Sequence, residues 1–171
     1  MRLLFEMDRK DYDKCTHEYM RNSSRAIIIC NNRLALVHSL RYDYFKFPGG
    51  GIEDGESRIG ALIRETREET GLVIIRDSIV EHGYVHRIQK SNTDETECFI
   101  QDNYYYFCDV RKHMIEQKLD RYEEREYFTL EFVDPEVAIS INSKAVDIPY
   151  DLMMLERESR VIKMLIESGY L

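Results

Sequence analysis

Apolar residues in this chain fall into short runs separated by polar stretches, a pattern that predicts several strands. A short strand is expected at Leu3–Met7, followed by a polar, irregular arm from Asp8 to Ser23. The run Ala26–Cys30 is continuously apolar apart from its last residue, which is typical of a strand buried on both faces. Asn31–Asn32 is a turn signal, and Leu34–His38 follows it as a second strand. These two strands are therefore expected to form a hairpin.

A helical period appears in the middle of the chain. Apolar or half-apolar side chains recur at positions i, i+3, i+4 and i+7 and predict one buried stripe: Ile59, Leu62, Ile63 and Thr66. Gly71 stands where a left-handed residue would end this helix. Before the helix, three consecutive glycines in Phe47–Gly51 exclude a regular element. They would let the backbone adopt positive φ and come close to a ligand.

The second half of the chain contains further strand patterns. Val73–Ile75 and Ile79–Arg87 are predicted strands, and Cys98–Val110 is a long one. The polar stretch Lys90–Glu95 is expected to be the turn of a long hairpin. Arg111–Arg125 is charged, has no regular period, and is interpreted as an irregular loop.

The end of the chain predicts one more strand and then helices. The strand is Leu130–Val133, after which Asp134 and Pro135 suit the cap and first position of a helix. A last helix is indicated by a stripe that contains Leu152, Leu155, Ser159, Ile162 and Ile166. Strands on both sides of an early helix, with a helix at the end, predict a mixed β-sheet between helices, an α/β fold. With no linker visible, residues 1–171 are expected to form a single domain.

Composition narrows the functional classes. A net charge of −8 argues against a nucleic-acid-binding surface, which needs a basic stripe. No stretch approaches a membrane span, and the first residues are too polar for a signal peptide. The four cysteines form no paired motif, which favours reduced thiols. We therefore expect a cytoplasmic protein that binds neither nucleic acid nor membrane.

Three glutamates crowd one face of the predicted helix. Glu65, Glu68 and Glu69 are spaced by three and four residues, and like charges at this spacing cost about 0.2–0.5 kcal/mol per pair. Arg64 and Arg67 offset this only in part. A hard cation such as Mg²⁺ or Mn²⁺ would offset it fully, because it prefers carboxylate oxygens. The alternative is an ordinary solvated acidic face.

The spacing around these glutamates resembles the Nudix box of the Nudix (MutT-like) hydrolases. Gly50 is followed after five residues by Glu56, and after seven more by Arg64 and Glu65. After two intervening residues come Glu68 and Glu69. One more residue separates them from Gly71 and the aliphatic Leu72. Thr66 departs from the pattern, because the family usually has an aliphatic residue there. The box, Gly50–Leu72, covers 23 of the 171 residues.

The resemblance implies a fold, a reaction and a metal site. The fold is a Nudix-type α/β/α sandwich with a mixed β-sheet. The reaction is a Mg²⁺-dependent attack of water on phosphorus in a nucleoside diphosphate linked to another moiety, with Mn²⁺ as an alternative ion. The implied metal ligands are the carbonyl of Gly49 and the carboxylates of Glu65, Glu68 and Glu69. Glu65 is also a candidate base, and Arg64 would hold a catalytic glutamate by an ion pair. Glu56 would support the junction between loop and helix.

Further site residues are expected outside the box. Many family members use an additional carboxylate from a later loop, and here Glu123 and Glu126 are the preferred candidates among Glu123, Glu124 and Glu126. Each has the alternative of being a solvated loop acid. For substrate binding, Arg25 is a candidate phosphate contact, and Tyr42, Tyr44 and Phe45 could stack on a base. Plain packing is the alternative for the three aromatic residues.

Two functions stay open at this point. The first is a pyrophosphohydrolase, and the second is a catalytically silent Nudix-fold module that senses a nucleotide or ADP-ribose. The complete set of glutamates favours the enzyme. A nucleoside triphosphate, an ADP-sugar and a dinucleoside polyphosphate present the same pyrophosphate, so the substrate cannot be chosen among them. The residues that select among these substrates are expected in three segments: Tyr42–Phe45, Tyr84–Gln89 and Asn103–Tyr106. A homodimer is possible.

Overall fold

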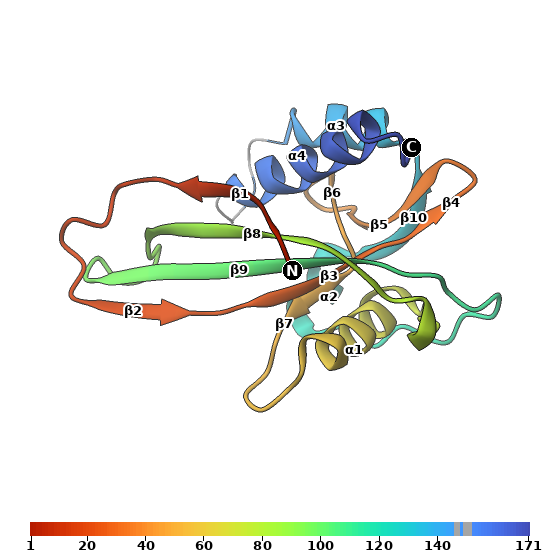
Figure 1. Cartoon of the computed structure of the whole chain (residues 1–171), viewed down its shortest axis with the longest axis horizontal. Helices are drawn as coiled ribbons and strands as arrows, with labels where there is room; N and C mark the ends of the chain where they lie inside the picture. Colours follow the sequence, from red (N-terminus) through yellow and green to blue (C-terminus); the bar gives the residue numbers. More distant parts are fainter. Residues whose placement is uncertain (146–147, 149–151) are drawn as a thin grey trace.

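Helices lie on both sides of a layer of strands in the computed structural model, which describes residues 1–145, 148 and 152–171. Helices α3 (Pro135–Asn142) and α4 (Met153–Glu167) lie on one side, and α1 (Arg58–Thr70) lies on the other (Figure 1). The α/β/α arrangement expected from the sequence is confirmed. A short helix, α2 (Arg121–Glu126), and a 3₁₀ turn at Arg76–Ser78 complete the helical elements of the described residues.

The strands form two sheets. The larger sheet is mixed, because β8 and β9 are antiparallel whereas β1, β2 and β3 run parallel to their neighbours β8 or β9. Its strands are, in order, β1 (Leu3–Asp8), β8 (Val80–Lys90), β9 (Glu97–Phe107), β3 (Ser23–Ile27) and β7 (Gly49–Gly51), with β2 (His17–Met20) also paired to β9. The smaller sheet is antiparallel and contains β10 (Phe128–Val133), β5 (Arg33–Ser39), β4 (Ile29–Cys30) and β6 (Tyr44–Lys46).

Alternating side chains of the larger sheet supply two separate cores. On β9, Tyr105 packs with α4 residues, whereas Tyr104 and Tyr106 pack in the cluster that contains Leu62 of α1. On β3, Ile27 belongs to the first cluster and its neighbour Ala26 to the second. Because successive side chains of a strand point to opposite faces, each central strand serves both helical layers. This explains why apolar and aromatic residues occupy successive positions at Ala26–Ile27 of β3 and at Tyr104–Phe107 of β9.

Helix α1 begins and ends as its sequence predicts. The Ser57 hydroxyl accepts a hydrogen bond from the backbone N–H of Gly60 at 3.0 Å, which satisfies a donor of the first turn. Gly71 ends the helix with a φ of 74°. A side chain there would also collide with the carbonyl of Ile115, because its Cβ would lie 2.2 Å from that oxygen. Leu62 and Thr66 of the predicted stripe are buried.

The predicted strand Ala26–Cys30 is in fact two strands in two sheets. The chain passes from β3 to β4 at Ile28, which is only 2% exposed. The run is apolar because both cores bury it, so the pattern could not reveal the break. The predicted hairpin itself is confirmed, since β4 and β5 are antiparallel. Asn31 and Asn32 connect them with φ values of 52° and 58°, which asparagine tolerates.

Four other expectations for local structure are wrong in part. The arm from Asp8 to Ser23 contains β2, whose four exposed side chains give no apolar period because backbone pairing with β9 forms it. The glycine stretch, which was expected to exclude a regular element, contributes β7. Val73–Ile75 makes only one bridge, between Ile74 and Val110. The irregular region Arg111–Arg125 contains most of α2.

Helix α4 buries an ion pair that the predicted stripe missed. Leu155 and Ile162 are buried as expected, but Leu152 is 48% exposed. Arg157 and Glu158 are 2% and 0% exposed and lie 2.7 Å apart. Glu158 also accepts hydrogen bonds from the backbone N–H of Phe47 at 2.7 Å and from the Tyr105 hydroxyl at 3.1 Å. The helix thereby holds the chain just before the glycines.

Loss of the buried Glu158 carboxylate should destabilise the protein strongly. Glu158→Ala leaves Arg157 without its partner, and breaking a buried ion pair costs about 3–5 kcal/mol. The exposed Glu156 on the same helix is the matched control, and Glu156→Ala should stay within about 0.5 kcal/mol of the wild type. Denaturant unfolding measures both. A cost below about 1 kcal/mol for Glu158→Ala would contradict a structural role for the pair.

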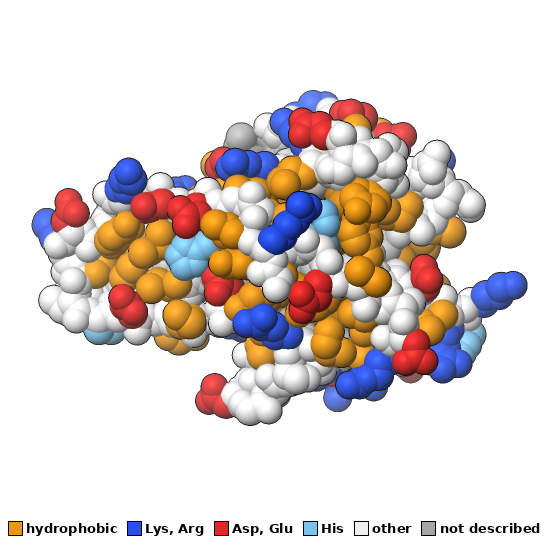
Figure 2. Space-filling view, in the orientation of Figure 1, with side chains coloured by type: hydrophobic (Ala, Val, Ile, Leu, Met, Phe, Trp, Pro, Cys, Tyr) orange, Lys and Arg blue, Asp and Glu red, His pale blue; other side chains and the backbone are white. Residues whose placement is uncertain are grey.

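The surface of the molecule mixes charges. On the face drawn in Figure 2, basic side chains lie singly among acidic ones and form no continuous stripe. Cys15, Cys30, Cys98 and Cys108 are free thiols. Among the residues that the structure describes, none of the helices has the length and apolar content that a membrane span requires.

Candidate metal centre

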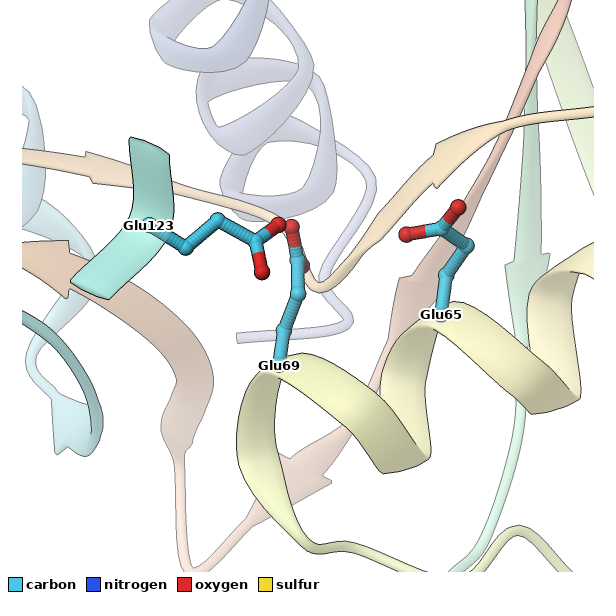
Figure 3. A group of neighbouring side chains, drawn as sticks. All are labelled: Glu65, Glu69 and Glu123. Atoms are coloured by element: carbon cyan, nitrogen blue, oxygen red, sulfur yellow. The ribbon is translucent and has the colours of Figure 1, made fainter. Parts of the chain in front are cut away.

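Three acidic side chains converge beside the glycine strand. Glu65 and Glu69 come from successive turns of α1 and Glu123 comes from α2, and one oxygen of each lies within 4.8 Å of the others. Figure 3 shows the carboxylates of Glu69 and Glu123 facing each other, with Glu65 projecting on the same side of α1. Glu69 is 1% exposed and Glu123 is 4% exposed. Two negative groups are therefore buried close together.

Helix α2 holds Glu123 in place through its first turn. The carboxylate of Glu123 accepts a hydrogen bond from the backbone N–H of Asp120 at 2.7 Å, and the Asp120 side chain completes a capping box. The hydroxyl of Tyr122 donates to the other carboxylate oxygen at 2.9 Å. This short helix thus orients one acid of the cluster.

Glu69 is held from two directions. The backbone N–H of Gly49 donates to one of its oxygens at 2.8 Å, and Lys46 forms an ion pair with the other. Burial raises the pKa of Glu69 to about 7, although the Lys46 charge acts in the opposite direction. Burial also raises the pKa of Glu65, against the effect of its hydrogen bond with Arg64. The anionic forms are therefore poorly compensated in the protein without a metal ion.

Glycine is required where β7 passes the cluster. A Cβ at Gly50 would lie 2.3 Å from an oxygen of Glu65, so a larger residue would displace this carboxylate. Gly49 has a φ of 134°, and its Cβ would lie 2.0 Å from the carbonyl oxygen of Ser24. The close approach expected of these glycines is therefore present, but the approached group is a carboxylate of the protein itself.

Arg64 connects the start of the box to its helix. It donates to both oxygens of Glu56 at 2.9 and 2.7 Å, to Glu65 at 2.7 Å and to the carbonyl of Gly51 at 3.1 Å. The hydrogen bonds with Glu56 raise the pKa of Arg64 and lower that of Glu56. The predicted ion pair with a glutamate and the predicted junction at Glu56 thus both have a geometric basis.

Other candidate acids lie outside the group of three. Glu68 contacts Arg64 at 3.4 Å and Arg67 at 3.7 Å, so its predicted role as a ligand requires its side chain to leave these partners. Glu126 is buried and accepts hydrogen bonds from the hydroxyls of Ser39 and Tyr44 at 2.8 and 2.9 Å. Of the two loop acids preferred from the sequence, the structure brings Glu123 to the cluster.

The predicted aromatic contacts to a base need correction. Tyr44 and Phe45 are 1% and 2% exposed, because β6 packs them into the core, where Phe45 stacks on His38. Neither ring offers a face to a ligand. Tyr42 is half-buried with Arg41 over its ring, so it remains a candidate.

Arg25 is 8% exposed and donates to the carbonyl oxygens of Phe47 and Gly49. The Gly49 carbonyl, a predicted metal ligand, is thus occupied by a guanidinium. Arg25 joins the candidate centre through this contact, and its charge also acts to lower the pKa of Glu69 and of Glu65, against the effect of burial.

Sequence reasoning missed two groups that contact the cluster. Lys46 lies between Phe45 and Phe47, and a lone lysine in an aromatic run was a usable signal that its charge has a partner. Gln117 lies in the charged loop and donates to the backbone carbonyl of Glu69, for which the sequence offers no signal.

The donor set fits a hard divalent cation. Its members are carboxylates, and the oxygen-rich site has no thiolate or imidazole within the group. Mg²⁺ and Mn²⁺ prefer such oxygen ligands. Burial of Glu69 and Glu123 without full compensation would be relieved by a bound cation, so the residues present suit one.

The raised pKa of Glu69 should make the free energy of unfolding of the metal-free protein depend on pH. A carboxyl whose pKa rises from 4.5 unfolded to about 7 folded stabilises the protein below pH 4.5, and this contribution is lost as the pH passes 7. Glu69→Gln has no such titration. Relative to wild type, the variant should therefore gain up to about 3 kcal/mol between about pH 5 and pH 8. Chemical denaturation in EDTA measures this difference, and a pH-independent difference would contradict it.

Comparisons with known proteins agree with this geometry. A family model described as NUDIX domain matches residues 20–150. A U8 snoRNA-decapping enzyme of Homalodisca vitripennis is 37% identical over 68 residues, and an RNA pyrophosphohydrolase of Vibrio cholerae is 48% identical over 48 residues. These alignments cover 39% and 27% of this chain, and the chain spans only 36% and 28% of those two relatives.

A solved structure has the same fold. A NUDIX hydrolase from Nitrosomonas europaea superposes with a TM-score of 0.58 at 19% identity, covering 84% of this chain and 90% of that protein. At this identity the likeness concerns the fold alone.

Proposed function

This chain belongs to the NUDIX domain family, and we propose that it is a Mg²⁺-dependent pyrophosphohydrolase, with Mn²⁺ as an alternative ion. Its proposed substrate is a nucleoside diphosphate linked to another moiety, such as a nucleoside triphosphate or an ADP-sugar. The observation that supports this proposal most directly is the group of carboxylates from Glu65, Glu69 and Glu123 within 4.8 Å. A buried acidic group of this kind is costly unless a cation accompanies it.

Glu65 and Glu69 would hold the ion, and Glu68 is a further candidate ligand if it leaves Arg64. When bound, the ion neutralises charge on the pyrophosphate and acidifies a water molecule. Arg64 keeps the Glu65 carboxylate oriented through their 2.7 Å hydrogen bond. The Gly49 N–H fixes Glu69 on the opposite side of the cluster. Because these positions are set by backbone and helix contacts, little rearrangement is needed when a substrate arrives.

Glu123 is the proposed general base. It lies on a different element from the box glutamates, and α2 belongs to the predicted charged loop. Its carboxylate receives the Tyr122 hydroxyl at 2.9 Å, which limits its rotation. A base must stand within hydrogen-bonding reach of the attacking water, and Glu123 faces the group where that water would be held.

The substrate class includes the 5′ end of an RNA as a specific candidate. Two of the relatives are named for RNA pyrophosphohydrolysis and for snoRNA decapping. The net charge of −8 disfavours an extended surface that binds many RNA phosphates. A triphosphate or capped end would need only the metal centre and its surroundings. This extends the sequence-based expectation, which excluded nucleic acid as a partner.

A silent sensor module is the less supported alternative. A protein that only binds a nucleotide does not need three acids gathered beside a glycine strand, and it would bear their repulsion without benefit. Arg64 spans Glu56, Glu65 and Gly51, which further favours a preserved catalytic arrangement.

The test of the function is a screen of nucleoside diphosphate derivatives with Mg²⁺ and with Mn²⁺, read as released phosphate and nucleotide. The panel contains nucleoside triphosphates, ADP-sugars, dinucleoside polyphosphates and a short 5′-triphosphate RNA. Turnover that requires the metal is the expected result. Tight nucleotide binding without turnover of any compound would favour the sensor.

Metal binding can be measured independently of turnover. Millimolar Mg²⁺ or Mn²⁺ should raise the Tm, because a ligand present at about 100 times its Kd adds about 2.7 kcal/mol of stability. Glu69→Gln should lose most of this rise. Glu167→Gln removes an equal charge from an exposed position at the end of α4 and serves as the control. An unchanged wild-type Tm at millimolar metal, with and without substrate, would refute the metal site.

A further inference from the structure

Lys46 extends from β6 into the interior beside the metal centre and is only 6% exposed. Its ammonium group forms an ion pair with one carboxylate oxygen of Glu69. The same group lies over the ring of Phe128, 4.8 Å from the ring centroid. A lysine is seldom buried without an anionic partner, and here the partner is an acid of the candidate metal centre. The carboxylate and the aromatic ring therefore hold this positive charge in place.

The ion pair uses a carboxylate that a metal ion also needs. The second oxygen of Glu69 accepts the hydrogen bond of the Gly49 N–H at 2.8 Å. Each oxygen of Glu69 therefore has a donor, and the Lys46 donor is charged. A cation that binds Glu69 either takes the place of the Lys46 ammonium or binds beside it. In both cases the ammonium opposes the cation, because two positive charges this close repel one another strongly in a buried site.

The Lys46 charge acts on more than its direct partner. Burial raises the pKa of Glu69 and of Glu65, and the Lys46 charge opposes this change at both groups. Glu123, which faces Glu69 (Figure 3), receives its hydrogen bonds from a backbone N–H and a tyrosine hydroxyl, both of which are neutral. Arg64 forms the ion pair with Glu65. Lys46 thus serves the side of the cluster formed by Glu69 and Glu123, whereas Arg64 serves Glu65.

We propose that Lys46 is a tethered counter-ion of the metal centre, which holds the acids together in metal-free protein, competes with the metal ion for Glu69 and thereby sets the affinity for that ion. This inference rests on the proposed function and concerns the regulation of the same site. Arg25 adds positive charge nearby, but its hydrogen bonds go to backbone carbonyls. Lys46 is therefore the side chain whose removal frees a carboxylate oxygen of Glu69.

Substitutions that remove the Lys46 charge test its role in the metal-free protein. Lys46→Met keeps the length of the side chain, and Lys46→Gln keeps a hydrogen-bond donor for Glu69. In EDTA both should lower the Tm, Lys46→Met by about 5–15 °C, because the buried Glu69 loses its ion-pair partner. The control Lys163→Met removes a lysine from an exposed position of α4 and should keep the Tm within about 2 °C of the wild type.

Metal affinity is the decisive measurement, because a packing defect would not strengthen it. Mg²⁺ and Mn²⁺ are titrated calorimetrically into each protein at about pH 8.5, above the pKa of about 7 of Glu69, which limits competition from a proton. Both Lys46 variants should bind the ions about tenfold more tightly than the wild type, because one opposing charge is gone. Lys163→Met should match the wild type. At one metal concentration, the ions should therefore raise the Tm more in the Lys46 variants than in the wild type.

A double-mutant cycle tests the contact itself. In the Glu69→Gln background, Lys46→Met should lower the Tm in EDTA much less than it does in the wild type, because the anionic partner is already absent. Equal losses in the two backgrounds would assign Lys46 to packing alone and overturn the inference. Circular dichroism checks the fold of every variant, and Lys46→Gln decides the test if Lys46→Met does not fold.

The metal titrations separate this inference from the function on which it rests. Metal binding that is unchanged or weaker in the folded Lys46 variants would overturn the competition and leave the hydrolase standing. The absence of metal binding to the wild type and to both Lys46 variants at millimolar concentration would overturn the metal centre and the inference together. Tighter metal binding in the Lys46 variants, without turnover of any compound in the substrate screen, would support the role of Lys46 and refute the hydrolase.

Discussion

Replacing Glu69 by glutamine is expected to lower kcat/KM by about 10²–10³-fold, the loss typical for removing one electrostatic contact to the transition state. Glutamine keeps the shape and can still accept the hydrogen bond from Gly49 N–H. It removes the negative charge that faces Glu123 at the centre of the cluster. The protein should therefore fold normally but hold the cation weakly. Steady-state kinetics over a range of Mg²⁺ and Mn²⁺ concentrations measures the loss.

The comparison with Glu167→Gln separates this effect from a general change of charge. That control should retain wild-type kinetics, because Glu167 is exposed at the end of α4. Partial recovery of Glu69→Gln at high metal concentration would agree with a weakened ligand set. If Glu69→Gln is as active as wild type at every metal concentration, Glu69 is not part of the metal centre.

Glu123→Gln should cost about 10²–10⁴-fold in kcat/KM, as expected when a general base is removed. The change keeps a side-chain oxygen for the hydrogen bonds from Asp120 N–H and the Tyr122 hydroxyl, so α2 should remain in place. The substrate KM should change less than kcat, because the lost step is proton transfer rather than binding.

Glu124 is the natural control for this substitution. It is the next residue of the same helix, it is exposed, and it lies outside the group of three. Glu124→Gln should therefore leave kcat/KM within a few fold of wild type. Equal, small effects of both substitutions would move the base into the box, where Glu65 is the next candidate.

Several features of this protein were determined by local sequence. The pattern from Gly50 to Leu72 was sufficient to predict helix α1 and its end at Gly71. The family resemblance of the same stretch implied the pairing of Arg64 with a glutamate. These features depend on residues within one helical turn of each other, whose geometry follows from the helix itself. The β8–β9 hairpin was predictable for a similar reason, because its two strands are long and joined by a polar turn.

Long-range packing decided which candidates share the site. The sequence did not separate the two preferred acids, Glu123 and Glu126. In the structure, α2 turns Glu123 toward α1 and buries Glu126 against Ser39 and Tyr44, whereas Glu124 stays in solvent. Short helices of this kind have too few residues for a visible period. Tyr44 and Phe45 differ from Tyr42 only because β6 pairs with β5 and becomes part of the core.

The surroundings of the buried ion pair of α4 and of Arg25 depend most on tertiary structure. Glu158 accepts hydrogen bonds from the Phe47 N–H and the Tyr105 hydroxyl, which lie 111 and 53 residues away in the sequence. Arg25 meets the Gly49 carbonyl because β3 pairs with β7. An isolated arginine near a strand end has no sequence signature that tells a ligand contact from a solvated charge. Sequence alone therefore determined the catalytic helix, whose groups are neighbours along one element. The surroundings of that helix were decided by the sheet, because contacts between distant segments are set by strand order and burial rather than by spacing.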